Sequence, residues 1–257
     1  MIARRSPSEL EKLHRSGLLV HQILSKLSGM VAVGVSTLDL EVEADRMIRD
    51  AGAKPAFKGY YSQSAGTKFP YVLCVSVNEE IVHGMPAQKK VLRAGDVVSL
   101  DTGVQLNGYF GDSAVTVALD PVTPETEKLL RVTRECLDRA IEQTVAGNRL
   151  ADISGAVERH AVTEGFSIVR EFVGHGIGTS LHEEPQVPNY VDRKNDNPRL
   201  KEGMVLAIEP MILAGRPESK VLNDKWTAVT KDGRNAAHFE HMVAVTNNGP
   251  WVLSRPA

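Results

Sequence analysis

An Asn-Gly pair at positions 107 and 108 constrains the fold more than any other feature of this sequence. Runs of alternating apolar and polar residues flank it on both sides. Asn-Gly between such runs is the strongest short-range signal for a two-residue β-hairpin, because a type I′ turn needs positive φ angles at both positions. The sequence therefore predicts an antiparallel hairpin centred on Asn107 and Gly108.

The predicted hairpin brings two aspartates together. A two-residue turn pairs Leu106 with Tyr109, so Gly103 lies opposite Asp112. Asp101 shares the face of Gly103, because side chains alternate between the faces of a strand, and Asp101 is therefore a diagonal neighbour of Asp112. Two carboxylates at such a separation repel each other unless a proton or a cation intervenes, and oxygen ligands suit a divalent metal. The alternative is that both aspartates lie on a solvated face.

The order of predicted elements repeats along the chain. Ser6-Pro7-Ser8-Glu9 is typical of a capping box with proline at the first helical position, and Thr123-Pro124-Glu125 opens a helix in the same way. Apolar periodicity predicts helices from Pro7 toward Gly29, over 37–52, from Thr123 and over 150–165, and strands over 71–78, 167–174, 204–213 and 237–246.

This repetition indicates an ancient duplication, although two similar α+β halves could also arise by chance. No low-complexity segment or flexible linker separates the halves. We therefore expect a single α+β catalytic domain over residues 1–257, with internal halves at about 6–120 and 123–250.

A histidine between glycines is a third candidate for site chemistry. His175 lies in the run Val-Gly-His-Gly-Ile-Gly at 173–178, which follows an apolar strand. Glycines let the backbone crowd close around an imidazole ring. Taken alone, such a histidine is more often a structural or loop residue than a ligand.

Two glutamates complete the set of candidates. Glu209 ends an apolar strand and precedes Pro210, and Glu240 lies between aromatic and apolar neighbours on a later strand. A buried acid needs a partner, and neither strand contains the lysine or arginine that would commonly supply one. Two aspartates, one histidine and two glutamates on strands together suit a two-metal site.

Composition sets the wider limits. The chain has 30 basic and 32 acidic residues among 257. This near-neutral net charge gives no overall attraction to nucleic acid or anionic membranes. Two cysteines cannot form a disulfide framework, and the start of the chain has no apolar run behind its basic residues. We expect a cytoplasmic protein with no membrane segment and no requirement for nucleic acid.

The stretches SLDTGVQLNGYFGDSAVT, EFVGHGIGTSLHEEP, GMVLAIEPM and HFEH, in this order, resemble the methionine aminopeptidases of the pita-bread metallopeptidase family. The resemblance spans nearly the whole chain. It implies a curved antiparallel sheet with helices on its outer face and two halves related by pseudo-twofold symmetry. It also implies that Asp101 and Glu240 bridge two divalent cations, that Asp112 completes one site, and that His175 and Glu209 complete the other.

The type of enzyme follows from spacing within the resemblance. His175 and Glu209 lie 34 residues apart, and Glu209 and Glu240 lie 31 apart, which leaves no room for the helical insertion of type II enzymes. A start at the first helix is similar to the short bacterial type I form. The cations could be cobalt, manganese, iron or zinc, because oxygen and imidazole ligands accept all four.

The resemblance further implies a reaction. A metal-bridged water would attack the first peptide bond, and the initiator methionine would be removed from nascent polypeptides whose second residue is small. Glu209 would shuttle the proton, His182 would stabilise the carbonyl oxygen, and His83 would contact the substrate amide. Phe69, Cys74, Leu181 and Trp226 would form the methionine pocket, with ordinary core packing as the alternative. We expect a monomer that acts on the N-termini of peptides or nascent chains. Association with the ribosome would be compatible with this activity.

Three positions depart from the family pattern. His238 stands where glutamine is usual, Thr179 stands where arginine is common, and the segment from Tyr60 to Phe69 is unusually long. Two rival functions stay open: a proline-directed aminopeptidase or dipeptidase, which usually carries a further N-terminal domain, and a binding module that has lost catalysis, which would normally have lost ligands.

Overall fold

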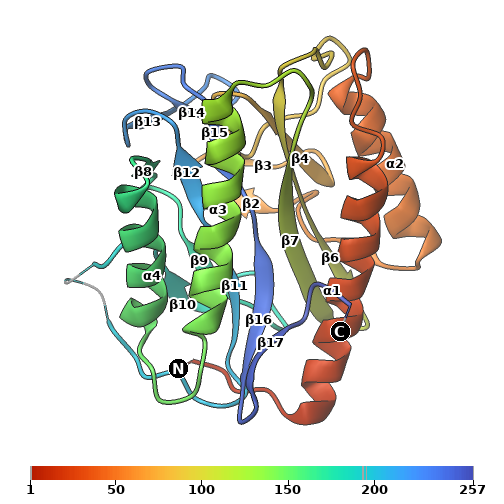
Figure 1. Cartoon of the computed structure of the whole chain (residues 1–257). Helices are drawn as coiled ribbons and strands as arrows, with labels where there is room; N and C mark the ends of the chain where they lie inside the picture. The colour runs from red at the N-terminus through yellow and green to blue at the C-terminus, as the bar shows by residue number, and fades with distance from the viewer. Residues whose placement is uncertain (1, 193, 195, 257) are drawn as a thin grey trace.

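The structure is a computed structural model of the chain, and it describes residues 2–192, 194 and 196–256. Two helices and a group of strands come first, and a second pair of helices and a second group of strands follow (Figure 1). The predicted α+β class is confirmed. Division of the domain into two halves by duplication stays a prediction, although the element order has the expected repeat.

Capping residues define where the helices begin. Helix α1 (Pro7–Ser28) and helix α2 (Thr37–Asp50) each start with a capping box, at Ser6 and Ser36 respectively. Helix α3 (Pro124–Glu142) has Thr123 as its N-cap, and helix α4 (Leu150–Thr163) follows it. All four predicted helices are therefore present, and the bounds that were predicted agree with the structure to within two residues.

The predicted hairpin is the longest strand pair. Strand β6 (Val97–Leu106) pairs with β7 (Tyr109–Ala118), and Gly103 lies opposite Asp112. Asn107 and Gly108 have φ angles of 52° and 85°, so both adopt the left-handed conformation that the turn requires. Strands β4 (Leu73–Val77) and β1 (Lys54–Pro55) pair with β6 and complete a four-stranded sheet.

Shorter strands build the rest of the molecule. A five-stranded sheet has the order β10-β9-β11-β16-β17, two three-stranded sheets have the orders β15-β12-β8 and β13-β14-β5, and β2 pairs with β3. The bounds are β2 Tyr61–Ser62, β3 Thr67–Lys68, β5 Glu80–Val82, β8 Ser167–Ile168, β9 Gly174–Gly176, β10 Glu183–Val187, β11 Val205–Ile208, β12 Met211–Leu213, β13 Ser219–Val221, β14 Ala228–Thr230, β15 Ala236–His238, β16 His241–Thr246 and β17 Gly249–Val252.

Three strands that the sequence predicts as continuous are each divided in two. The run 167–174 contains β8 and the start of β9, the run 204–213 breaks at Glu209 and Pro210, and the run 237–246 breaks after His238. Proline has no N–H to donate to a sheet, which explains the break beside Glu209. After each of these two later breaks the chain moves to a different sheet, because β11 pairs with β16 while β12 pairs with β15.

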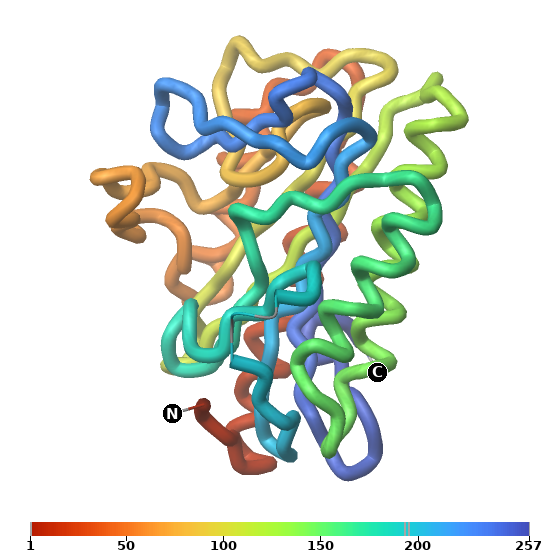
Figure 2. Tube along the Cα trace, turned by 90° about the vertical axis from the view of Figure 1, so that its left-hand side faces the viewer, coloured from red at the N-terminus to blue at the C-terminus, as the bar shows by residue number. Residues whose placement is uncertain are grey.

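Each helix pair covers one face of its own sheet. Val98, Leu100 and Val104 of β6 pack in the apolar core under α1 and α2, and Leu206 and Ile208 of β11 pack in the core under α3 and α4. Because side chains alternate along a strand, the residues directly before and after these in the sequence face away from the helices. Figure 2 shows α3 and α4, in green, on the side opposite the orange segment that contains β2 and β3.

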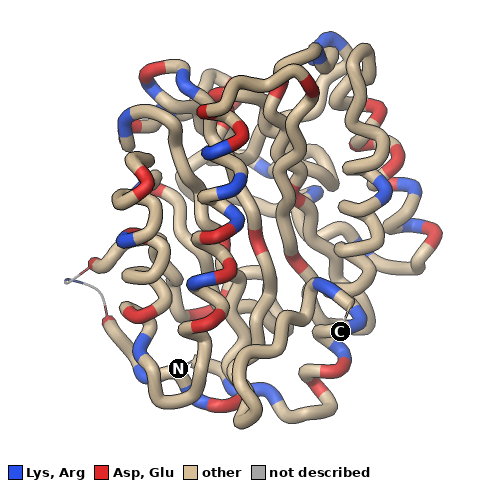
Figure 3. The backbone as a smooth tube through the Cα atoms, in the orientation of Figure 1, with Lys and Arg blue, Asp and Glu red and all other residues tan. Residues whose placement is uncertain are grey.

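The two halves meet along β7. Glu240 forms a bridge with Ala114, in which the Glu240 N–H donates to the Ala114 carbonyl oxygen at 2.9 Å. Figure 3 shows acidic positions on the central strands as well as on the helices.

Both cysteines are buried and free. None of the helices in the described ranges is long and apolar enough to cross a membrane.

Candidate metal centre

The face of the sheets that turns away from the helices is hollowed into a cleft of about 680 Å³. Its lining comes from both halves of the chain. All eleven residues that the sequence predicts for the site line this one cleft: Phe69, Cys74, His83, Asp101, Asp112, His175, Leu181, His182, Glu209, Trp226 and Glu240.

The hairpin positions the aspartate pair as predicted. Asp101 lies opposite Ala114, and Asp112 lies opposite Gly103, so the two carboxylates are diagonal neighbours. One oxygen of each, Oδ1, is buried and has no hydrogen-bond partner within the described chain. Burial raises the pKa of Asp101 to about 7, and burial together with the charge of Asp101 raises the pKa of Asp112 well above its usual range. The alternative of a solvated face is therefore wrong for Asp112, which is 3% exposed.

His175 is held in one tautomer by its own strand. Its Nδ1 lies 2.9 Å from the carbonyl oxygen of Gly176. A carbonyl can only accept, so Nδ1 carries the proton and Nε2 keeps its lone pair. Nε2 lies 3.7 Å from Glu209 Oε1 and 4.0 Å from Asp112 Oδ2. Burial lowers the pKa of His175 to about 3, so the ring is neutral and able to bind a metal.

The glycines beside His175 are needed for close backbone approach, as the sequence predicts. A Cβ at Gly174 would lie 2.4 Å from the carbonyl oxygen of Ala207, and one at Gly176 would lie 2.3 Å from that of Glu184. Side chains at these positions would push apart the strands that flank β9. The two glycines therefore let β9 carry His175 into the cleft between β10 and β11.

Glu209 and Glu240 both lie where a strand breaks. Each follows a short buried strand segment, and each points into the cleft rather than along a regular ladder. Burial raises the pKa of Glu209 to about 8, and burial with the charges of Asp112, Glu209 and Asp101 raises that of Glu240 well above its usual range. Within the described residues, neither glutamate has an ion pair with lysine or arginine.

The donor set fits divalent metal. Asp112, His175 and Glu240 each offer a ligand atom, and these atoms lie within 4.8 Å of one another. Glu209 adjoins this group through His175, and Asp101 through its neighbour Asp112. Buried oxygens of Asp101, Asp112 and Glu240 lack hydrogen-bond partners in the described part of the chain. Four carboxylates and a neutral imidazole in one buried cluster need a compensating positive charge. A set of oxygen and nitrogen ligands suits hard or borderline cations.

Two further histidines border the metal-binding cluster. The His182 ring meets the His175 ring edge to face at 4.4 Å. His83 has a φ of 60°, which is strained for a residue with a side chain, and its ring lies edge-on to Trp226 and Phe172. Burial lowers the pKa of His83 to about 4 and lowers that of His182, so both rings are neutral at physiological pH.

One end of the cleft is apolar. Phe69, Cys74 and Trp226 belong to one buried cluster, in which the Phe69 and Trp226 rings meet edge to face at 5.1 Å. Cys74 lies opposite Asp101 in the β4–β6 ladder, so this apolar end adjoins the aspartates. Leu181 lines the same cleft but packs in a different cluster, with residues of α1.

The departures from the expected motif also lie at the site. His238 Nε2 lies 3.6 Å from Glu209 Oε2 and has no hydrogen-bond partner among the described residues. The Thr179 N–H donates to Glu183 Oε1, and the guanidinium beside this loop comes from Arg5, whose Nη2 donates to the same oxygen at 2.6 Å.

Sequence reasoning did not find Arg5 or Tyr60, both of which contact the loop that carries His182. The Tyr60 hydroxyl lies 2.8 Å from His182 Nδ1. Tyr60 begins the segment whose length departs from the family pattern, and that length was the only available signal. The position of Arg5 ahead of the first helix gave none.

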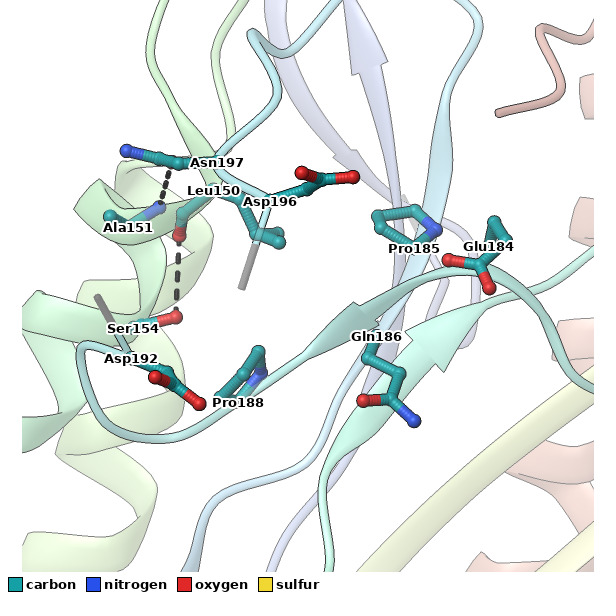
Figure 4. Close-up of a pocket in the computed structure, with 10 residues that line it drawn as sticks. All are labelled: Leu150, Ala151, Ser154, Glu184, Pro185, Gln186, Pro188, Asp192, Asp196 and Asn197. Carbon is teal, nitrogen blue, oxygen red and sulfur yellow. Dashed lines mark hydrogen bonds between the residues drawn. The ribbon is translucent and has the colours of Figure 1, made fainter. Parts of the chain in front are cut away.

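A second, smaller hollow lies beside the start of α4 (Figure 4). Its volume is about 190 Å³, and Asn197 Oδ1 accepts from the Ala151 N–H at its edge. The described lining contains no histidine, cysteine, lysine or arginine. Glu184 and Gln186 line both this hollow and the larger cleft.

Comparisons with known proteins give one consistent result. Residues 11–247 match Metallopeptidase family M24. "Methionine aminopeptidase 1" of Bacillus subtilis is 46% identical over 255 residues, which cover 99% of this chain and 100% of that protein. The crystal structure of methionine aminopeptidase from Thermotoga maritima has a TM-score of 0.94 and 41% identity, and all of both chains is covered.

A more distant likeness concerns the fold alone. The prolidase from Pyrococcus furiosus has a TM-score of 0.78 and 19% identity, and this chain covers 66% of that longer protein. The predicted pita-bread fold is confirmed by these likenesses.

Proposed function

The chain belongs to Metallopeptidase family M24, and from that premise we propose that it removes N-terminal methionine from polypeptides by metal-dependent hydrolysis. The observation that carries this proposal is the buried cluster of carboxylates around His175, whose oxygens lack partners in the described chain. The names of the full-length relatives support methionine as the residue removed.

We propose two divalent cations, held by Asp101, Asp112, His175, Glu209 and Glu240. The cluster supports this number because it gathers four acidic groups, more negative charge than one divalent ion balances. Bound there, such ions would polarise the scissile carbonyl and lower the pKa of water. These ligand types accept cobalt, manganese, iron and zinc.

Three side chains of the cleft have proposed roles in the hydrolysis reaction. Glu209 accepts a proton from the attacking water and delivers it to the leaving amine, a task that suits a carboxylate lining the cleft beside the metal-binding cluster. His182 donates a hydrogen bond to the carbonyl oxygen as negative charge develops there. His83, which also lines the cleft, contacts the substrate amide.

The apolar end of the cleft would receive the methionine side chain. Phe69, Cys74 and Trp226 offer aromatic edges and a thiol, surfaces on which a flexible thioether packs well. Leu181 borders this pocket from the neighbouring cluster. A small second residue, a monomeric enzyme, contact with the ribosome and a cytoplasmic location stay predictions.

Peptide hydrolysis separates this function from its rivals. We expect the metal-loaded protein to release methionine from Met-Gly-Met-Met and to leave a Xaa-Pro peptide intact. A preference for the Xaa-Pro peptide would favour the prolidase-like alternative, and binding without hydrolysis of either would favour a binding module.

Asp112→Asn tests the metal cluster, because it removes a ligand charge and keeps the shape of the side chain. We expect turnover to fall by more than roughly a hundredfold while the protein stays folded. Asp138→Asn, on an exposed helix position, is the control and should leave turnover unchanged. Undiminished turnover in Asp112→Asn would contradict the assignment.

A further inference from the structure

The Tyr60 side chain contacts His182 in the cleft. Its hydroxyl oxygen lies 2.8 Å from His182 Nδ1, and the two rings meet edge to face with centroids 5.0 Å apart. Both residues line the cleft. The two side chains come from positions 122 residues apart in the sequence, so only the fold brings them together.

Backbone hydrogen bonds hold Tyr60 in place. Its N–H donates to the Phe57 carbonyl oxygen, and its own carbonyl oxygen accepts from the Phe69 N–H, each at 2.9 Å. Tyr60 therefore lies at the base of the small hairpin formed by β2 and β3, directly beside a residue of the apolar pocket. Tyr60 is 38% exposed, so its hydroxyl is not required to fill the protein interior.

The hydrogen bond between Tyr60 and His182 has a preferred direction. A neutral imidazole has one N–H donor and one acceptor nitrogen, and a phenol hydroxyl can donate or accept. A phenol, with a pKa of about 10, is a much stronger acid than a neutral imidazole N–H, so donation from the hydroxyl to the ring nitrogen is favoured. His182 Nδ1 then acts as the acceptor, and Nε2 carries the proton.

His175 provides a contrast within the same site. Its Nδ1 donates to a backbone carbonyl, which leaves Nε2 free to bind metal. The hydroxyl beside His182 can donate where the carbonyl beside His175 cannot, so the favoured His182 tautomer carries its proton on the opposite ring nitrogen. Among the described residues, no hydrogen-bond partner is found for His182 Nε2, and that atom is available to a substrate in the cleft.

We propose that Tyr60 is a positioning residue that acts through His182: its hydroxyl fixes the His182 tautomer in which Nε2–H donates to the substrate carbonyl oxygen. The inference rests on the proposed function of the cleft as a peptidase site. It assigns a role to the unusual 60–69 segment, which brings the tyrosine to the edge of the cleft.

Kinetics of Tyr60→Phe test the role in catalysis. The variant removes the hydroxyl and keeps the ring, and we expect kcat on Met-Gly-Met-Met to fall roughly tenfold with little change in KM, as for other partners that orient a site residue. Tyr61→Phe is the matched control, because Tyr61 is 56% exposed and does not line the cleft. An unchanged kcat in Tyr60→Phe would overturn the proposal.

A double-mutant cycle separates action through His182 from direct contact with substrate. In the His182→Ala background, Tyr60→Phe should cause no further loss of kcat, because the residue through which it acts is gone. A second tenfold loss in that background would overturn the proposal and assign Tyr60 a separate contact.

Nitrogen-15 NMR of the zinc-loaded, histidine-labelled protein reads the tautomer without reference to activity. The His182 signals are assigned by their absence in His182→Ala. We expect His182 Nε2 to be protonated in the wild type and in Tyr61→Phe. In Tyr60→Phe we expect the chemical shift of His182 Nδ1 to move toward that of an unprotonated ring nitrogen without a hydrogen-bond donor. A proton on Nδ1 in the wild type, or no shift change in Tyr60→Phe, would overturn the proposal. Failure of the wild type to release methionine would instead overturn the peptidase function, and the tautomer would still be measured.

Discussion

At the scale of single residues, the site combines strained or tightly packed backbone with buried charge. His83 holds a positive φ, and Gly174 and Gly176 leave no room for a Cβ. Such strain lasts only where surrounding structure enforces it, and it is common at functional sites. The antiparallel strands around the cleft are the structure that enforces it here.

Gly176→Ala tests how tightly the backbone is packed around His175. The new Cβ would lie 2.3 Å from the Glu184 carbonyl oxygen, and backbone cannot move aside as a flexible side chain can. We expect a loss of more than about 2 kcal/mol in the free energy of unfolding, together with weaker metal binding. Chemical denaturation and metal titration measure the two effects.

Gly29→Ala is the control for this substitution. Gly29 has a φ of −72° at the end of α1, and the nearest atom to a new Cβ is 3.5 Å away. Its unfolding free energy should change by less than about 0.5 kcal/mol. Equal effects of the two substitutions would refute the packing argument.

At the scale of elements, the segment that precedes α1 is tied to the loop that carries His182. Arg5 Nη2 donates to Glu183 Oε1 at 2.6 Å, and the same oxygen accepts from the backbone N–H groups of Thr179 and Ser180. The Arg5 N–H also donates to the Gly203 carbonyl oxygen. One carboxylate therefore joins the start of the chain to a loop of the second half.

Arg5→Ala should loosen this loop. We expect the unfolding free energy to fall by about 1–2 kcal/mol, because the variant leaves a partly buried carboxylate without its cation, and kcat to fall because His182 is less well placed. Arg4→Ala is the matched control, since within the described residues the Arg4 guanidinium donates only to the exposed carbonyl oxygen of Glu202. Thermal unfolding and peptide hydrolysis of both variants provide the comparison, and equal behaviour of the two would count against the link.

At the scale of the whole molecule, both halves deliver acidic groups to one buried cleft, and this couples stability to pH. Burial raises the pKa of Asp101 to about 7 and that of Glu209 to about 8. An unfolded chain releases these protons near pH 4, so between roughly pH 4 and 8 the native state holds more protons than the unfolded state. In protein stripped of metal, these groups therefore lower stability as pH rises through that window.

Divalent cations reverse this dependence, because they replace the protons on the same carboxylates. We expect the increase in Tm on adding manganese to be larger at about pH 8 than at about pH 5, as scanning calorimetry of chelator-treated protein would measure. Asp101→Asn removes one of the titrating groups, and the metal-free variant should depend less on pH. A metal effect that shrinks as pH rises would contradict the cluster as described.

Much of this architecture could be predicted from local sequence signals. Capping residues placed the starts of α1 and α3, and the turn at Asn107 and Gly108 placed Asp101 beside Asp112. These predictions were correct because caps and two-residue turns depend on a few adjacent residues and fix strand register by themselves. Assignment of His175, Glu209 and Glu240 to the same site depended on resemblance rather than on any local rule.

Tertiary structure alone decided the rest. Pro210 explains the break at Glu209, but the move of the chain to a different sheet there and after His238 depends on pairing between distant strands, which leaves no mark on hydrophobic periodicity. The contacts of Arg5 with Glu183 and of Tyr60 with His182 join residues more than a hundred positions apart. The sequence by itself therefore determined the helices, the central hairpin and its paired aspartates, whereas long-range packing determined which side chains surround the substrate, because a local pattern contains no information about a distant partner.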